Sequence, residues 1–85
     1  MSADYPDNFK YTSSTQTLSW DNTEGVEEVE ILISQSSGTP NWSIVYEGGG
    51  NHCPLNVPSG IYYMKGKNRR PPGNEYCPPE TVTVG

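Results

Sequence analysis

Short stretches of alternating apolar and polar residues recur along this chain, and clusters of glycine, proline, asparagine and aspartate separate them. Such alternation is typical of β-strands with one buried face, because successive side chains of a strand point to opposite sides. Short strands at regular spacing predict an antiparallel sandwich or barrel. We predict an all-β fold with seven strands, at residues 9–13, 15–20, 26–34, 42–46, 53–57, 61–67 and 81–84.

Helix is the alternative to strand, and the composition disfavours it. Alanine occurs once and leucine three times, whereas 9 glycines and 8 prolines interrupt the 85 residues. The segment 26–34 contains three glutamates, which are good helix formers. Val29, Ile31 and Ile33 alternate strictly there, however, and β-branched residues at this spacing favour a strand.

A chain of 85 residues is long enough for one domain. We predict a polar N-terminal arm at residues 1–8 and a single sandwich domain at residues 9–85. The loop at 68–80 contains four prolines, which exclude it from a central strand. The chain begins at Met1 and ends after a strand-like stretch, which favours a complete small protein over a module of a longer one.

Three residue groups carry a family resemblance. Residues 18–20 are Leu-Ser-Trp, Trp42 precedes a strand-like stretch, and residues 55–63 combine a strand, a Pro-Ser-Gly turn and two tyrosines. These groups resemble the second-strand L-x-W, the aromatic residue that opens the fourth strand, and the tyrosine corner of fibronectin type III domains. The resemblance covers residues 9–84. It implies a seven-stranded antiparallel sandwich of fibronectin type III or immunoglobulin-like type, with Trp20 as a structural residue.

In that corner a tyrosine near the start of the sixth strand buries its ring and returns its hydroxyl to the backbone a few residues upstream. Parity favours Tyr62, because Gly66 then points inward while Lys65 and Lys67 face water. Tyr63 is the alternative, and it would turn both lysines toward the core at high cost. Gly66 departs from the family, which usually keeps an apolar residue there, so an irregular edge or a bulge is expected.

Cys53 and Cys77 are the only cysteines, and each precedes a proline. In the predicted strand order they fall at the same pole, where they could form a disulfide that closes a loop of about 25 residues. Two free thiols in a reducing compartment are the alternative. His52 adjoins Cys53, but neighbouring residues on a strand face opposite ways, so we expect no metal site and no cofactor.

Three loops of such a sandwich meet at one pole, those joining strands two to three, four to five and six to seven. Arginine and tyrosine are frequent in binding hot spots, and prolines lower the entropy cost of ordering the last loop on contact. We therefore predict a binding pole, with loops that are merely solvated as the alternative. Its candidate residues are Asn22, His52, Arg69, Arg70, Asn74 and Tyr76. Trp42, Tyr46 or Tyr76 could instead stack on sugar rings.

The charge balance and the motifs disfavour several functions. The formal net charge is −5 with one adjacent basic pair, which disfavours nucleic-acid binding. No apolar stretch is long enough to span a membrane, and the N-terminus lacks a secretory signal. We expect no enzymatic activity, because no nucleophile motif accompanies His52 and the glutamates at 24–30 are typical of a solvated strand face. Residues 48–50, Gly-Gly-Gly, indicate a flexible turn and not a phosphate-binding loop.

These observations favour a non-enzymatic module that binds a larger protein assembly. Domains of this kind also occur in tailed-bacteriophage virions, so the resemblance implies a virion accessory protein, assembled in the host cytoplasm. It would be a capsid decoration or cement domain, or a tail-associated one, and its partner a capsid or tail protein. Edge strands at 9–13 or 81–84, or the N-terminal arm, could join copies into a homo-oligomer.

Two other hypotheses remain from the sequence. One is a spacer or carbohydrate-binding module of a secreted multidomain enzyme or adhesin, which a Cys53–Cys77 disulfide would favour. The other is a small hydrolase built around His52.

Overall fold

The computed structural model describes residues 5–35, 38, 41–70 and 75–85, and the fold of these residues is all-β. None of them is helical, so this part of the chain has no helix that could cross a membrane. The seven strands are β1 (Asp7–Thr12), β2 (Thr17–Asp21), β3 (Glu28–Ser34), β4 (Ser43–Gly48), β5 (His52–Pro54), β6 (Gly60–Arg70) and β7 (Glu80–Val84).

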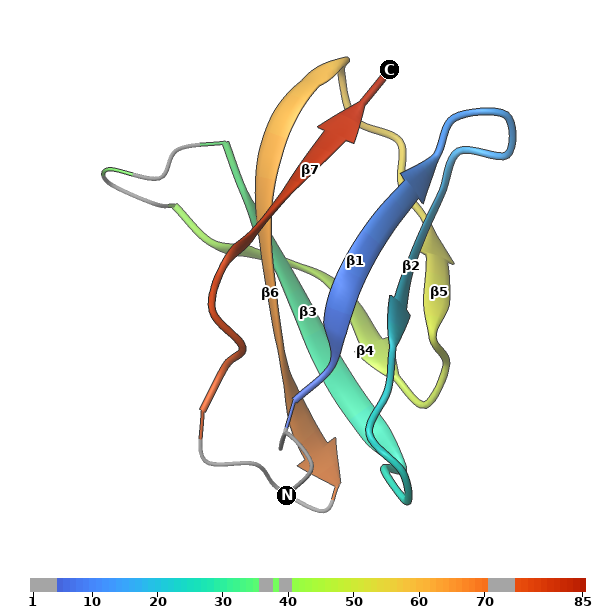
Figure 1. The fold of residues 1–85 in the computed structure, drawn as a ribbon, viewed down its shortest axis with the longest axis vertical. Helices are drawn as coiled ribbons and strands as arrows, with labels where there is room; N and C mark the ends of the chain where they lie inside the picture. The colour runs from blue at the N-terminus through green and yellow to red at the C-terminus, as the bar shows by residue number, and fades with distance from the viewer. Residues whose placement is uncertain (1–4, 36–37, 39–40, 71–74) are drawn as a thin grey trace.

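The strands form two antiparallel sheets that pack together (Figure 1). One sheet has the order β1-β2-β5, and the other has the order β4-β3-β6-β7. We call these the three-stranded sheet and the four-stranded sheet. β3 and β6 lie in the middle of the four-stranded sheet. Successive residues of these two strands point alternately to a buried inner face and to an outer face.

The core lies between the sheets and comes from the inward positions of nearly every strand. Trp20 sits near its middle, with its ring 6.1 Å from that of Phe9 and 5.2 Å from that of Tyr46. The predicted alternation of the third strand is confirmed, since Val29, Ile31 and Ile33 are all buried. The remaining buried apolar side chains are those of Leu18, Cys53, Leu55, Tyr62, Met64, Cys77, Val82 and Val84.

β1 begins earlier than predicted, inside the segment 1–8 that the sequence assigns to an arm. Pro6 is fully buried, and Asn8 has a φ of 57° where the pairing of β1 with β2 is irregular. The carboxylate of Glu80 on β7 accepts hydrogen bonds from the backbone N–H groups of Asn8, at 3.1 Å, and Phe9, at 2.9 Å. This contact explains the early start, because it ties the first strand to the last strand of the other sheet.

β6 is longer than predicted and continues through Arg70, three residues into the segment assigned to a loop. A bulge in β6 at Arg69, opposite Glu28 and Val29, keeps the pairing going, and the N–H of Glu27 donates to the carbonyl of Arg70 at 2.6 Å. Arg69 therefore projects from a strand and not from a loop. β5 is shorter than predicted and ends at Pro54.

Gly66 pairs regularly with Ile31, so the irregularity expected there is absent. Its role is close packing. A Cβ atom on Gly66 would lie 2.6 Å from Cγ of Pro6 and 2.8 Å from Cδ1 of Ile31. Glycine therefore lets the chain before β1 settle directly on the middle of β6.

The two adjacent tyrosines of β6 point to opposite faces. Tyr62 is buried, and its hydroxyl donates a hydrogen bond to the carbonyl of Pro58 at 2.7 Å, which gives the inward parity that the sequence predicts for this residue. The amide of Gln35 donates to the same hydroxyl at 3.4 Å. Tyr63 lies on the outer face and is half-buried.

The glycine run at 48–50 has a packing role that the prediction of a flexible turn missed. The ring of Tyr46 points inward, and the N–H of Gly50 donates to its hydroxyl at 2.7 Å. Cβ atoms on Gly48 or Gly50 would each lie 2.8 Å from that hydroxyl oxygen. The run therefore leaves room for the hydroxyl of the half-buried Tyr46 to reach the backbone.

Candidate functional site

The β2–β3 loop and the end of β6 lie at the same end of the molecule (Figure 1). The side chain of Asn22 donates to the carbonyl of Gly50 at 3.0 Å, which joins the β2–β3 and β4–β5 loops. The side chain of Asn68 at the end of β6 donates to the hydroxyl of Thr23 at 2.9 Å. Asn74, which was predicted to lie on this pole, is outside the described residues.

Asn22 serves the fold at this pole. Its side-chain oxygen accepts a hydrogen bond from the indole N–H of Trp20 at 2.9 Å, while its amide holds Gly50. Both ends of the amide are thus occupied within the molecule. The residue braces two loops and offers little to a partner.

His52 lies apart from the other predicted site residues. It is exposed on β5, where it pairs with Ser19, and its Nδ1 lies 3.0 Å from the side-chain oxygen of Asn51. Within the part of the chain that the structure describes, no group of three or more histidine, cysteine or acidic residues could hold a metal ion.

The four-stranded sheet carries the most organised group of polar side chains, on its outer face. β6 places Tyr62, Met64 and other alternate residues in the core, so the residues between them point outward. The outward positions of β6 are Ile61, Tyr63, Lys65, Lys67 and Arg69. We call this surface, together with the outward residues of β3 and β4, the outer face.

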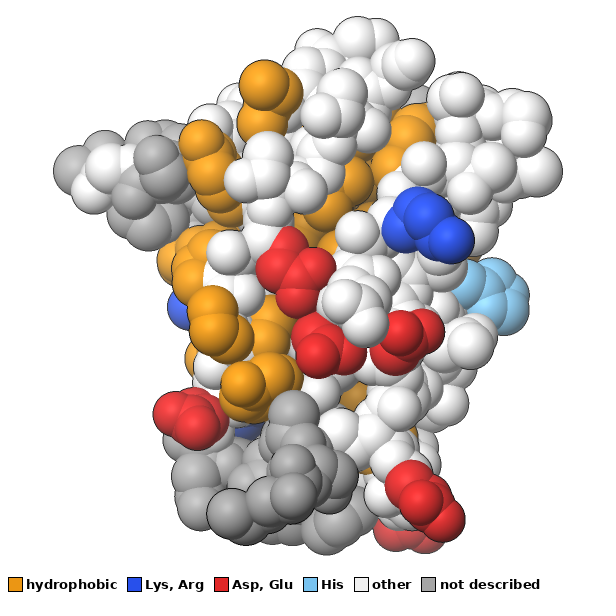
Figure 2. Space-filling model, in the orientation of Figure 1, with side chains coloured by type: hydrophobic (Ala, Val, Ile, Leu, Met, Phe, Trp, Pro, Cys, Tyr) orange, Lys and Arg blue, Asp and Glu red, His pale blue; other side chains and the backbone are white. Residues whose placement is uncertain are grey.

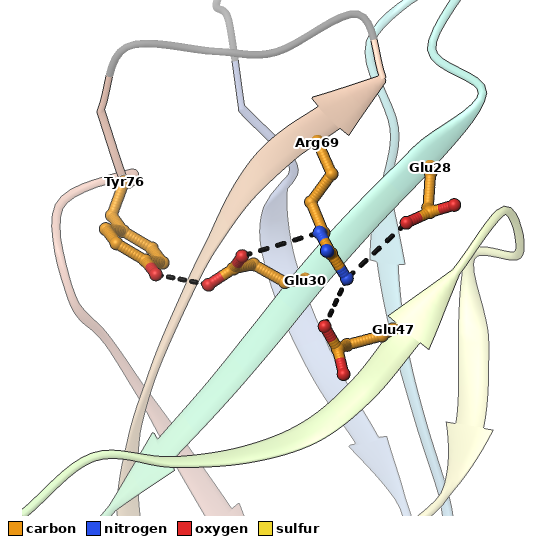
Figure 3. A network of polar contacts seen from close by, with 5 residues as sticks. All are labelled: Glu28, Glu30, Glu47, Arg69 and Tyr76. Atoms are coloured by element: carbon orange, nitrogen blue, oxygen red, sulfur yellow. Dashed lines mark hydrogen bonds and ion pairs between the residues drawn. The ribbon is translucent and has the colours of Figure 1, made fainter.

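Arg69 lies at the centre of an ion cluster on the outer face (Figure 3). Its guanidinium contacts Glu28 at 3.4 Å and Glu30 at 3.8 Å, and it forms a hydrogen-bonded ion pair with Glu47. Three strands supply these residues, so the cluster links β4, β3 and β6. Arg69, which was predicted as a binding residue of the pole, is therefore engaged within the molecule.

Tyr76 joins this cluster from the segment that leads into β7, and its hydroxyl donates a hydrogen bond to Glu30 (Figure 3). Partial burial, the hydrogen bond to Glu30 and the charge of Glu30 raise the pKa of Tyr76 to about 12, against the opposing charge of Arg69. The tyrosine therefore stays protonated at neutral pH. Arg70, in contrast, is exposed at the end of β6.

Aromatic rings hold the two lysines of the outer face. Nζ of Lys65 lies 4.5 Å from the ring centre of Trp42 and 4.3 Å from that of Tyr76. Nζ of Lys67 lies 5.3 Å from the ring centre of Tyr76. The ring faces attract the ammonium groups, so both chains are half-buried and directed before any partner arrives.

Of the residues predicted to stack on sugars, Tyr46 faces the core, and Nζ of Lys65 lies over the rings of both Trp42 and Tyr76. On the side of the molecule shown in Figure 2, acidic side chains gather where β7 and β1 lie in front. Hydrophobic side chains line the side formed by β7 and the chain that leads into it.

The two cysteines are free and buried. Cys53 belongs to the three-stranded sheet, whereas the N–H of Cys77 donates to the carbonyl of Gly66 in the other sheet at 2.9 Å. Of the two alternatives, free thiols are therefore the one seen in the structure: Cys53 lies in the three-stranded sheet, whereas Cys77 precedes β7 and packs beside β6 of the other sheet. Burial raises the pKa of both thiols, and the N–H of Gly66 opposes this at Cys77 by donating to its Sγ at 3.3 Å.

The sequence alone did not reveal the outer face as a site. The alternation that predicts β3 and β6 also places Glu28, Glu30, Lys65 and Lys67 on one side, which was interpreted as ordinary solvation. What brings these residues together is the register of the two strands, in which Glu30 pairs with Lys67, and the alternation within each strand does not define that register.

No protein-family model matches the chain, and no curated protein and no solved structure matches it.

Proposed function

We propose that this protein is a non-enzymatic binding module that docks onto a partner protein through the outer face. The observation that carries the proposal is the position of Lys65 between the rings of Trp42 and Tyr76, beside the Arg69 cluster. Side chains held in place before contact lose little rotamer freedom on binding. Tryptophan, tyrosine and arginine are also the residues most often found in binding hot spots.

Exposed apolar side chains on the same face support docking. Ile61 on β6 is 58% exposed, and Ile44, which pairs with the outward Leu32, is 55% exposed. These are the large hydrophobic side chains that the described residues expose most. An apolar area next to organised polar groups is typical of protein interfaces.

The charge distribution also favours this face over the rest of the surface. Lys65, Lys67 and Arg69 balance the three glutamates of the Arg69 cluster, so the outer face is close to neutral. The net charge of −5 is then carried by other residues. The outer face would therefore repel an acidic partner protein less than the rest of the surface does.

For the fold type we propose a fibronectin type III-like sandwich. The division into three and four strands and the hydrogen bond from Tyr62 to Pro58 support it. For the biological setting we propose a virion accessory role with a capsid or tail protein as partner, as expected from the same resemblance. The carbohydrate-binding alternative is weaker, since Tyr46 is turned inward and Trp42 is shared with Lys65.

The proposal is tested by capture of the native assembly. The protein and its Ile44→Glu/Ile61→Glu variant are each incubated with assemblies from the source, and retained protein is quantified by native mass spectrometry. The variant should lose retention, while a Lys10→Glu control on the exposed edge of the three-stranded sheet keeps it. Retention of the double variant at the wild-type ratio would show that the outer face is not the docking surface.

A further inference from the structure

The basic residues of this acidic chain are concentrated on one strand. Four of the five lysines and arginines belong to β6. The charge of Arg69 is matched by Glu28, Glu30 and Glu47, all within 4.0 Å. In the described part of the chain, neither Lys65 nor Lys67 has a carboxylate at ion-pair distance. Within the described residues, their ammonium groups lie over the rings of Trp42 and Tyr76.

We infer that Lys65 and Lys67 form a docking site for two carboxylates of an extended acidic segment of a partner protein. This inference rests on the proposed function, and it names the chemistry of the partner. The rings of Trp42 and Tyr76 leave both ammonium groups with free hydrogen-bond donors, because a ring attracts the charge without accepting directed bonds from all three N–H groups. A carboxylate supplies the missing acceptors.

The spacing of the two lysines selects an extended partner. They are two residues apart on the same face of β6, and so are separated by about 6.6 Å along the strand. An extended peptide that runs along the face repeats its own side chains at the same interval, so acidic residues at positions i and i+2 match the lysines. On the Lys65 side of this pair, the next side chains that the partner segment turns toward the outer face lie opposite Tyr63 and Ile61, so they should be apolar.

The surroundings of the lysines exclude nucleic acid as the occupant. Glu30, which pairs with Lys67, and Glu28 and Glu47 nearby would repel a continuous phosphate backbone. A polypeptide can place two carboxylates on the lysines and keep neutral residues over the glutamates. The same argument favours a segment with few acidic residues outside the matched pair.

The experiment is an NMR titration of the isotope-labelled protein with synthetic peptides. The probe is acetyl-Ile-Ser-Val-Ser-Glu-Ser-Glu-Ser-amide, compared with a peptide that has glutamine at both acidic positions and one that has the two glutamates adjacent. We expect shifts at Lys65, Lys67 and Tyr76 with the first peptide only. The Lys65→Gln/Lys67→Gln variant should bind it about fivefold more weakly, as expected for two partly exposed charge pairs, and added salt should weaken it further.

A Lys10→Gln variant is the matched control and should bind the probe like the wild type, because Lys10 lies on β1. Equal binding of the glutamine peptide, or an unchanged affinity of the double lysine variant, would overturn the inference. A dimer seen by analytical ultracentrifugation that the double lysine variant abolishes would also overturn it and assign the site to a second copy. If the acidic probe fails while Ile44→Glu/Ile61→Glu still abolishes capture, the inference fails and the proposed function stands.

Discussion

One carboxylate oxygen of Glu80 accepts a hydrogen bond from the backbone N–H of Phe9, at 2.9 Å. The other oxygen accepts from the N–H of Asn8, at 3.1 Å, so both donors left over by the irregular pairing of β1 are satisfied. A single side chain thus completes the backbone hydrogen bonding of a strand in the opposite sheet.

Replacing Glu80 with glutamine should lower the free energy of unfolding by about 1–3 kcal/mol. The amide keeps one acceptor oxygen, but its NH₂ group would face a backbone N–H. Urea denaturation compares this variant with Glu75→Gln, whose side chain is exposed and forms no hydrogen bond with the described residues. Equal denaturation midpoints for the two variants would contradict the bridging role of Glu80.

Removing the hydroxyl of Tyr62 should destabilise the fold by about 1 kcal/mol, because the hydrogen bond that it donates to the carbonyl of Pro58 is lost. Tyr63→Phe is the matched control, since its hydroxyl forms no hydrogen bond to any residue that the structure describes and Tyr63 lies on the outer face. Thermal unfolding followed by circular dichroism distinguishes the two. A larger loss for Tyr63→Phe would mean that the corner is formed by the other tyrosine.

Adding a methyl group at Gly66 should cost about 1–3 kcal/mol, because the new Cβ overlaps Pro6 and Ile31. Gly38→Ala is the control, as no atom lies within 4 Å of a Cβ built there. Denaturant midpoints of the two variants provide the measurement. A neutral Gly66→Ala variant would show that Pro6 does not pack on β6.

Cys53 and Cys77 should resist alkylation in the native protein and react fully once it is unfolded. They are 5% and 2% exposed, and burial raises the pKa of both thiols, so little reactive thiolate is present. Iodoacetamide labelling without reductant, followed by mass spectrometry, counts the modified thiols. Absence of label even in denaturant would reveal a disulfide that the structure does not contain.

Alkaline pH should destabilise the protein through Tyr76. Its pKa of about 12 exceeds the ordinary value of 10.0, so the folded state holds this proton more tightly than the unfolded chain. That stabilisation is fully present below pH about 10 and is lost as the pH rises through about 12. Tyrosinate absorbance should include a late-ionising contribution from Tyr76, which Glu30→Gln shifts to lower pH. A Glu30→Gln titration curve identical to the wild type would contradict this.

The alternation of apolar and polar residues predicted the strands best where every second side chain is buried without a bulge. In β3 the β-branched residues alone select the inner face, so the order Val29, Ile31, Ile33 could be predicted from the sequence. The inward position of Tyr62 follows from the same parity, because the lysines of β6 cannot be buried without partners.

Features that depend on pairing between distant segments could not be predicted. In β4 the residues Ile44 and Tyr46 have the same parity, yet the bulge opposite Ile31 and Leu32 turns one outward and the other inward. The continuation of β6 to Arg70 depends on Glu27, more than forty residues away. The ion cluster of the outer face depends on the register of three strands, which alternation within each strand does not define.

The contact between Glu80 and Phe9 joins residues 71 positions apart in the sequence. It therefore brings together the strand of this sandwich that is synthesised first and the strand that is synthesised last. Contacts of such long sequence separation carry a large loop-closure entropy and are associated with slow folding. Until Glu80 is synthesised, the N–H groups of Asn8 and Phe9 lack their acceptor, so the nascent chain cannot close this edge of its core. Synthesis of the final strand, and not of the central ones, is thus the step that completes the sandwich.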